Sequence, residues 1–305
     1  MAAYTYQEYY EMGTGILQAA GIEEAALDAR LLLEFLLKTN RNDLLVHGDR
    51  GVEKTAADTY RDLIQRRAER IPLQYLTGTQ EFMGLSFMVN EHVLIPRQDT
   101  EILVEAAMKE LQDNMRILDM CTGSGCILIS LLYYSNGCHG TGADISKEAL
   151  HVAVQNARRL LDGKADFSET AQNPKEELFE QRTRIEFLES DLFRAIKDKY
   201  HMIVSNPPYI RTGVLPELMP EVREHEPVSA LDGHEDGLYY YRRIVRESRD
   251  YLVSGGRIYL ETGFDQAGEV RLLLSENGFM EIETIQDYAG QNRVVTGIYM
   301  NPRGQ

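Results

Sequence analysis

Between residues 116 and 300 the sequence alternates short apolar runs with segments of helical length, and this alternation restricts the fold more than any other feature. The strand-like runs cover residues 116–120, 140–144, 184–188, 201–205, 256–262, 280–286 and 294–300. Helices fit most of the intervals between them. Strands separated by helices form βαβ units, in which a mainly parallel sheet is covered on both faces. The sequence therefore predicts a doubly wound α/β fold.

The residues that precede this alternation have a helical pattern. Leu27, Leu31 and Phe35 recur at helical spacing, and a second apolar stripe runs from residue 60 to Pro72, which cannot continue a helix. We therefore expect a small helical bundle over residues 1–75. It contains no recognisable chemistry, which favours a role in docking a substrate or covering a site.

A third pattern lies between the helical segment and the alternating strands and helices. Residues 76–96 mix aromatic and β-branched residues around Gly84, which is typical of a β-hairpin. We expect this hairpin to link the bundle to a larger domain over residues 97–305. Within that domain, residues 162–182 are polar and have no apolar period, so a surface loop or a partly disordered insertion is expected there.

The net charge restricts the class of partner. The chain has 32 Lys and Arg residues against 48 Asp and Glu residues, a net charge of −16. Nucleic-acid affinity comes from cationic groups that displace counterions, so this balance disfavours a nucleic-acid substrate, whereas the same field attracts a basic protein. No run approaches the roughly 18 apolar residues of a membrane span, and no basic, apolar leader follows Met1. We expect a cytoplasmic protein without membrane contact.

The three cysteines do not predict a metal site. Cys121, Cys126 and Cys138 are odd in number, and the seven histidines are scattered instead of standing at ligand spacing. In a cytosolic chain such cysteines are expected to be free thiols.

Residues 117–127 combine a strand, a glycine turn and the start of a helix, an arrangement that brings backbone close to a ligand. A Walker motif is excluded because no Lys-Ser/Thr pair follows the glycines, and a dinucleotide fingerprint would need a third glycine where Leu128 stands. A ligand without a pyrophosphate, such as S-adenosylmethionine, remains. By itself the loop is also compatible with a tight turn that binds nothing.

Two acidic residues lie at the ends of the next strands. Asp144 comes about 20 residues after the glycine loop, where a carboxylate can accept hydrogen bonds from both ribose hydroxyls, although a lone aspartate at this place is also a common helix cap. Asp191 follows the third strand and is suitably placed for an adenine edge, with Leu192 next to it to pack on the ring.

The segment Asn206-Pro207-Pro208-Tyr209 follows the fourth strand and indicates the chemistry most directly. The Asn206 side-chain oxygen and a proline carbonyl can accept both N–H bonds of a planar NH₂ group, and Tyr209 can stack on that group. An amide nitrogen is a poor nucleophile because its lone pair is delocalised, so polarising it and aiming it at a methyl donor would promote transfer.

Together these motifs resemble those of class I methyltransferases that act on NH₂ groups, and more specifically the HemK/PrmC family of glutamine methyltransferases. Similar segments extend over nearly the whole chain. They are Ile71-Pro-Leu-Gln-Tyr75, Gly78, Phe82-x-Gly84-Leu-x-Phe87, Leu94-Ile-Pro-Arg97, Thr100-Glu101, Glu226-Pro227, Ala230-Leu231, Asp236-Gly237-Leu238, Leu260-Glu261, Gly290 and Arg293-Val-Val. The resemblance implies a Rossmann-like methyltransferase domain with a small N-terminal helical domain.

The resemblance also implies a role for individual residues. The cofactor-binding residues would be Asp119, Cys121, Thr122, Gly123, Ser124, Gly125, Asp144, Asp191, Leu192 and Asn206. The catalytic and substrate-binding residues would be Asn206, Pro207, Pro208 and Tyr209, with Arg97 and Glu226 near the substrate. No residue presents itself as a general base.

The chain departs from the family pattern at a few positions. Gln98-Asp99 stands where Pro-Glu is common, Cys121 replaces a frequent glycine, and Leu192 replaces a frequent aromatic residue. None of these changes removes a group that the chemistry requires.

The resemblance implies S-adenosylmethionine-dependent methylation of the side-chain amide of the glutamine in the Gly-Gly-Gln motif of class I peptide chain release factors. Three alternatives stay open. They are a glutamine of a ribosomal protein, an exocyclic amine of DNA or rRNA, and a binding protein without activity. A base-flipping enzyme would need cationic groove contacts, which the net charge disfavours.

Overall fold

The computed structural model describes residues 4–162, 165–166 and 183–301 of the chain. The chain forms two compact units. Met1–Thr79 and Met219–His225 form the first, which we call the helical unit, and Gln80–Leu218 and Glu226–Gln305 form the second, which we call the sheet unit.

The helical unit is built around amphipathic helices. Its helices are α1 (Tyr6–Ala19), α2 (Ala25–Leu37), α3 (Arg41–Val46), α4 (Lys54–Ala68), α5 (Leu73–Thr77) and α9 (Pro220–His225). Gly13 permits the close approach of α1 and α4, because a Cβ there would lie 2.3 Å from the Tyr60 hydroxyl oxygen. That hydroxyl donates to the Ala29 carbonyl at 2.9 Å, which connects α4 to α2.

A buried ion cluster holds α9 within the helical unit. Arg67 Nε donates to Asp28 at 2.7 Å, and Arg67 Nη2 donates to Glu221 at 3.0 Å. Arg70 reaches the same Glu221 oxygen at 3.0 Å. Burial opposes ionisation of Glu221, but its own backbone amide and the two arginines together lower its pKa. A segment far along the chain is thereby tied to α2 and α4.

The sheet unit contains an eight-stranded sheet. In spatial order its strands are β5 (Ala165–Asp166), β6 (Thr183–Glu189), β4 (His139–Asp144), β3 (Arg116–Met120), β7 (Tyr200–Ser205), β8 (Leu252–Glu261), β10 (Asn292–Tyr299) and β9 (Phe279–Gln286). β10 is antiparallel to both of its neighbours, and the other pairs are parallel. The predicted doubly wound, mainly parallel sheet is confirmed.

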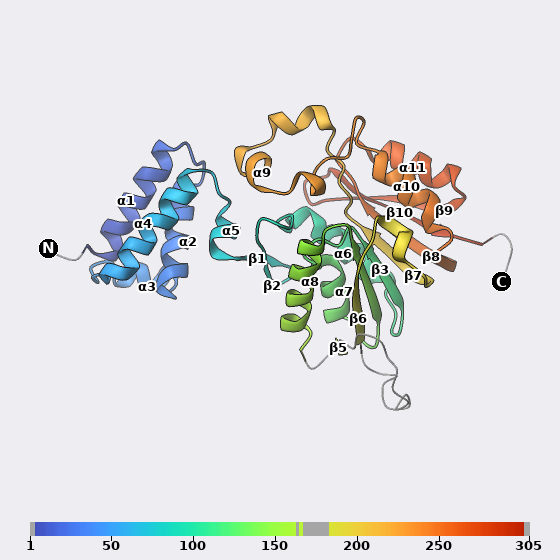
Figure 1. The fold of residues 1–305 in the computed structure, drawn as a ribbon, viewed down its shortest axis with the longest axis horizontal. Coiled ribbons are helices and arrows are strands. Elements are labelled where there is room, and N and C mark those ends of the chain that lie inside the picture. The colour runs from blue at the N-terminus through green and yellow to red at the C-terminus, as the bar shows by residue number, and fades with distance from the viewer. Residues whose placement is uncertain (1–3, 163–164, 167–182, 302–305) are drawn as a thin grey trace. The chain divides into compact units, whose positions relative to one another are not determined.

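Successive residues of each strand pack against opposite helical layers, as the pleat requires. Ile117 and Tyr259 belong to the core beneath α6 (Gln98–Glu110), α7 (Cys126–Tyr133) and α8 (Lys147–Leu160). Leu118 and Leu260 belong to the core beneath α10 (Tyr239–Ser248) and α11 (Ala267–Glu276). Figure 1 shows α7 and α8 on one side of the sheet and α10 and α11 on the other.

The predicted hairpin is present as β1 (Thr79–Phe82) and β2 (Leu85–Met88). The Phe82 and Phe87 rings pack edge to face, 6.0 Å apart, in the core with α6 and α7. Asn156 of α8 also bonds both the amide and the carbonyl of Met88, at 2.7 and 3.0 Å. The hairpin side chains thus help to build the sheet unit. The domain limits expected at residues 75 and 96 stay predictions.

Two local expectations differ from the structure. The helix expected to reach Pro72 ends at Ala68, because Arg70 adopts a left-handed backbone with φ of 70°. In the expected insertion, residues 163–164 and 167–182 lie outside the described residues, and residues 165–166 form the edge strand β5, which the pattern did not predict.

Candidate active site

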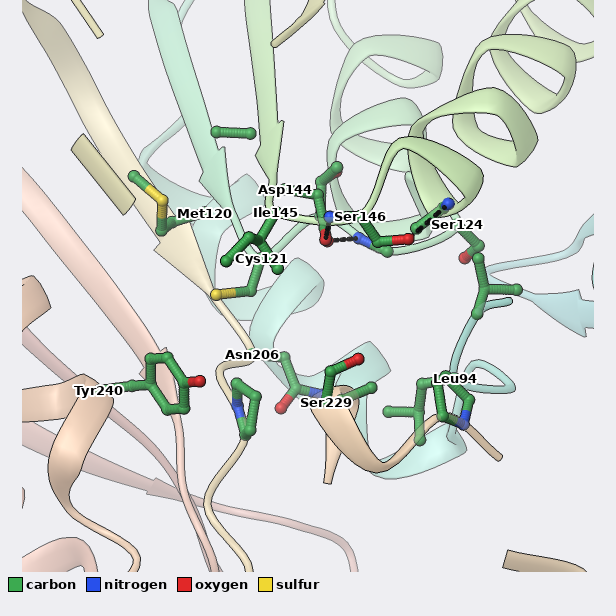
Figure 2. A pocket seen from close by; sticks show the side chains of 18 of the residues that line it. Leu94, Met120, Cys121, Ser124, Asp144, Ile145, Ser146, Asn206, Ser229 and Tyr240 are labelled. Atoms are coloured by element: carbon green, nitrogen blue, oxygen red, sulfur yellow. Dashed lines mark hydrogen bonds between the residues drawn. The ribbon is translucent and has the colours of Figure 1, made fainter. Parts of the chain in front are cut away.

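A cavity of about 300 Å³ opens at the carboxyl ends of the central strands of the sheet unit. Figure 2 shows Asp144, Ile145 and Ser146 on one side of it and Asn206 and Ser229 on the opposite side. This is where a doubly wound sheet binds ligands, because the chain leaves β3 towards β4 on one side and β7 lies on the other.

Strand register brings the predicted motifs together. Met120 of β3 pairs with Ala143 of β4 and with Ser205 of β7. The next residue in each strand or loop, Cys121, Asp144 and Asn206, therefore leaves the sheet at the same edge, and all three line the cavity. Segments more than 80 residues apart in the chain meet at one site.

The glycine loop takes a strained path past the cavity. Cys121 has a left-handed backbone with φ of 61°, a conformation that a glycine adopts without steric cost, and this explains why a glycine is frequent there. At Gly123 an added Cβ would meet nothing within 4 Å, so a ligand can approach the backbone. At Gly125 it would lie 2.8 Å from Ile129, so this glycine serves helix packing and does not line the cavity.

Asp119 supports the loop from below. It is fully buried, accepts a 2.6 Å hydrogen bond from the Thr122 hydroxyl, and does not line the cavity. Burial raises its pKa to about 7. Asp119 therefore holds the Thr122 side chain in position and has no exposed surface that a ligand could contact. Thr122 and Ser124 themselves line the cavity.

Asp144 is oriented by backbone amides. Its Oδ2 accepts from Gly123 at 2.8 Å and its Oδ1 from Ser146 at 2.9 Å. Burial raises its pKa, and the hydrogen bonds from Ser146 and Gly123 oppose that shift. Each carboxylate oxygen keeps further acceptor capacity for a ligand hydroxyl. The alternative role of helix cap belongs to Ser146 instead of Asp144, because the Ser146 hydroxyl caps α8 by accepting from the Ala149 amide.

Asp191 and Leu192 line the same cavity beyond Asp144. Asp191 accepts a 2.9 Å hydrogen bond from Arg243 of α10. Leu192 is buried and has φ of 49°, another left-handed backbone. Arg243 also lies 5.7 Å from the centre of the Tyr239 ring, so a cation and an aromatic group adjoin the wall that was expected to face an adenine.

The Asn206–Tyr209 segment is divided between the cavity and the core. Asn206 and Pro208 line the cavity, whereas Pro207 and Tyr209 do not. The Tyr209 hydroxyl donates to Glu261 at 3.4 Å, and burial together with that carboxylate raises the pKa of Tyr209. The Tyr209 ring therefore packs behind the loop and not in the cavity. This position does not support the predicted stacking of Tyr209 on a substrate.

Arg97 and Glu226 form an ion pair at the rim. Arg97 lines the cavity and donates to Glu226, whose side chain is only 1% exposed and does not line it. Burial raises the pKa of Glu226, and the Arg97 guanidinium opposes the shift. Of the two predicted residues, only Arg97 can contact a ligand here.

The Cys121 thiol, which lines the cavity, is unsuited to nucleophilic chemistry. Cys121, Cys126 and Cys138 are free, and burial together with the charges of Asp144 and Asp119 raises the pKa of Cys121 well above its ordinary value. Among residues 4–162, 165–166 and 183–301, no group of three or more His, Cys, Asp or Glu side chains could hold a metal ion.

Comparison with known proteins decides the family. A model described as the PrmC N-terminal domain matches residues 8–78, and one described as the methyltransferase small domain matches residues 97–219. The release factor glutamine methyltransferase of Clostridium acetobutylicum is 39% identical over 276 residues, which cover 89% of this chain and 90% of that protein. That of Geobacter sulfurreducens is 38% identical over 295 residues, 96% of each chain.

The chain belongs to the release factor glutamine methyltransferase family. A solved methyltransferase from Pyrococcus furiosus, 14% identical with a TM-score of 0.50, covers 78% of this chain and 100% of its own, and shows the fold alone. The predicted family, fold class and dependence on S-adenosylmethionine are confirmed. The roles assigned to individual residues stay predictions. No described helix is long and apolar enough to cross a membrane.

The cavity fits the cofactor of a glutamine methyltransferase. Gly123 leaves the backbone open to approach, and Asp144 presents two oriented carboxylate oxygens. Ile145, next to Asp144, lines the cavity and is 63% exposed, so it offers an apolar surface on which a planar ring can pack.

Several residues of this methyltransferase site were not predicted from the sequence. Ile145, His234, Tyr239, Tyr240 and Arg243 all line the cavity. The His234 and Tyr239 rings lie 4.3 Å apart, and those of Tyr239 and Tyr240 5.1 Å apart. A signal was available, because the Asp236-Gly237-Leu238 segment that carries part of the resemblance lies between these aromatic residues.

Proposed function

We propose that this enzyme transfers a methyl group from S-adenosylmethionine to the side-chain amide nitrogen of the glutamine in the Gly-Gly-Gln motif of class I release factors. The single observation that carries the proposal is the position of Asn206, which lines the cavity beside Cys121 of the glycine loop. An amide acceptor beside the methyl-donor site is what an NH₂ substrate needs. Relatives with 38–39% identity that are named for this activity support it.

The division of labour follows from the cavity walls. The glycine loop and Asp144 would hold the cofactor, with Ile145, Asp191 and Leu192 around its adenine. S-adenosylmethionine supplies an electrophilic methyl group on sulfur. Asn206 would accept a hydrogen bond from the substrate amide, orient its nitrogen and increase its electron density. The methylated nitrogen would then lose its proton to solvent.

Mass spectrometry tests the proposal. The release factor is incubated with enzyme and S-adenosylmethionine, digested, and examined for a single added methyl group on the glutamine of the Gly-Gly-Gln peptide. Fragment ions must locate the methyl group on the side-chain amide. A methyl group on any other residue would contradict the proposed substrate atom.

Asp144 is expected to contribute to cofactor affinity through hydrogen bonds to the ribose. Asp144→Ala should weaken S-adenosylmethionine binding by roughly 1.5–3 kcal/mol, the range for a hydrogen bond to a charged group. Calorimetry measures the change. Glu148→Ala removes an exposed carboxylate from the next helix and should leave affinity unchanged. Equal affinities for wild type and Asp144→Ala would refute the ribose assignment.

We also propose that the helical unit docks the release factor. In α3 no residue is buried, and Leu45 and Val46 are 73% and 72% exposed. The family model described as the PrmC N-terminal domain covers this segment, and the acidic chain would attract a basic partner. Deleting the helices would strip Glu221 of its buried partners, so surface substitutions make the better test.

Leu45→Ser combined with Val46→Ser should lower kcat/KM for the intact release factor by about tenfold, the scale of a modest interface hot spot. A short Gly-Gly-Gln peptide should be methylated at an unchanged rate. Leu272→Ser, which changes a leucine with 62% exposure on α11, is the matched control. If the double variant processes the intact factor normally, α3 is not a docking surface.

A further inference from the structure

The Asn206 side-chain amide has two ends with opposite hydrogen-bonding sense. Its oxygen accepts and its nitrogen donates, so only the oxygen can bind an NH₂ group. If the amide were rotated by half a turn, two donors would face each other across the cavity. The proposed reaction therefore depends on which end of Asn206 faces the substrate, and the residue cannot determine this alone.

The structure shows what holds the nitrogen end. Asn206 Nδ2 donates to the Thr100 hydroxyl oxygen at 3.3 Å. Thr100 lies in the first turn of α6, is 2% exposed, and lines the cavity. Within the described ranges, no protein donor binds Asn206 Oδ1, which leaves the oxygen available to a ligand.

The Thr100 hydroxyl needs an orientation of its own, because it accepts from Asn206 only when its proton points elsewhere. Glu261, at the end of β8 and 1% exposed, is the acceptor that faces it. The Thr100 hydroxyl lowers the pKa of this carboxyl group, and within the described residues Glu261 Oε2 is buried without a hydrogen-bond partner of its own. Burial raises the pKa of Glu261 to about 7, and Thr100 and Arg293 oppose the shift. Asp99 of α6 and the Tyr209 hydroxyl also face this carboxyl group.

We propose that Thr100, oriented by Glu261, is a positioning residue that turns the Asn206 amide oxygen towards the substrate. The inference rests on the proposed function, because only an NH₂ substrate requires an acceptor at this point. It gives a role to Thr100 and Glu261, which lie in segments that resemble the family but had no assigned function.

Kinetics with the release factor at saturating S-adenosylmethionine test this. Thr100→Val keeps the shape but removes the hydroxyl, so kcat should fall by about tenfold, as expected for one lost hydrogen bond, with cofactor affinity within about twofold. Thr100→Ser keeps the hydroxyl and should stay within about threefold of wild type. Thr296→Val removes a hydroxyl that is 1% exposed on β10 and should not change kcat.

A double-mutant cycle separates positioning from a structural role. If Thr100 acts through Asn206, Thr100→Val should cause no further loss in an Asn206→Ala background. Additive losses, a Thr100→Ser variant as poor as Thr100→Val, or a parallel loss of cofactor affinity would each overturn the inference. An active wild type with an unimpaired Thr100→Val variant contradicts this inference alone, whereas a wild type that leaves the glutamine unmethylated contradicts the proposed function as well.

Discussion

Asn206→Ala should lower kcat on the order of 10²–10³-fold while leaving S-adenosylmethionine affinity nearly unchanged, by analogy with the loss of one preorganised polar group from an active site. The physical reason is that Asn206 would bind the substrate amide and, within the described part of the chain, has no hydrogen bond to the glycine loop that we propose as part of the cofactor site. Single-turnover methylation of the release factor measures the rate, and calorimetry measures cofactor affinity.

Asn206→Asp provides the comparison for this variant. Aspartate keeps an acceptor oxygen at the same position, so it should be at least about ten times more active than alanine, the scale of a hydrogen bond to a charged group. Loss of cofactor binding in Asn206→Ala would show that the residue holds the cofactor, and its proposed role in orienting the substrate amide would then be wrong.

Arg67→Met should destabilise the helical unit by about 3–5 kcal/mol, the usual result of removing one partner from a buried ion pair. The Arg67 and Asp28 side chains are each 9% exposed, and that of Glu221 is 11% exposed. After the substitution, Asp28 loses its ion pair with Arg67, and Glu221 keeps its ion pair with Arg70. Hydrogen exchange should show the loss of protection in peptides from α2, α4 and α9.

An exposed pair is the control for that prediction. Arg246, whose side chain is 65% exposed, pairs with Glu247, and Arg246→Met should change stability by less than about 0.5 kcal/mol. If Arg67→Met has an equally small effect, the ion cluster does not hold α9 in the helical unit.

Much of the fold could be predicted because its signals are local. The order of strands and helices follows from apolar runs and their spacing, and the parallel arrangement follows from the helical crossovers. The meeting of Cys121, Asp144 and Asn206 also follows, because each stands just past or at the carboxyl end of a central strand. A short edge strand such as β5 has too few residues to give such a signal.

The remainder depends on pairs that are distant in the chain. Asn206 and Thr100 are 106 residues apart, and Arg67 and Glu221 are 154 residues apart. Nothing in one sequence relates such residues, because packing decides which side chains meet. The sequence did not predict that the Tyr209 ring points away from the cavity for the same reason, because its hydrogen-bond acceptor, Glu261, lies on another strand, β8.

The proposed substrate is tested most directly by transfer of label from S-adenosylmethionine to four acceptors. These are the purified release factor, the same factor with its Gly-Gly-Gln glutamine replaced, DNA and rRNA. We expect label on the unmodified factor alone, which would establish the reaction and the acceptor residue together. Label on nucleic acid, or equal label on the two forms of the factor, would contradict the substrate assignment.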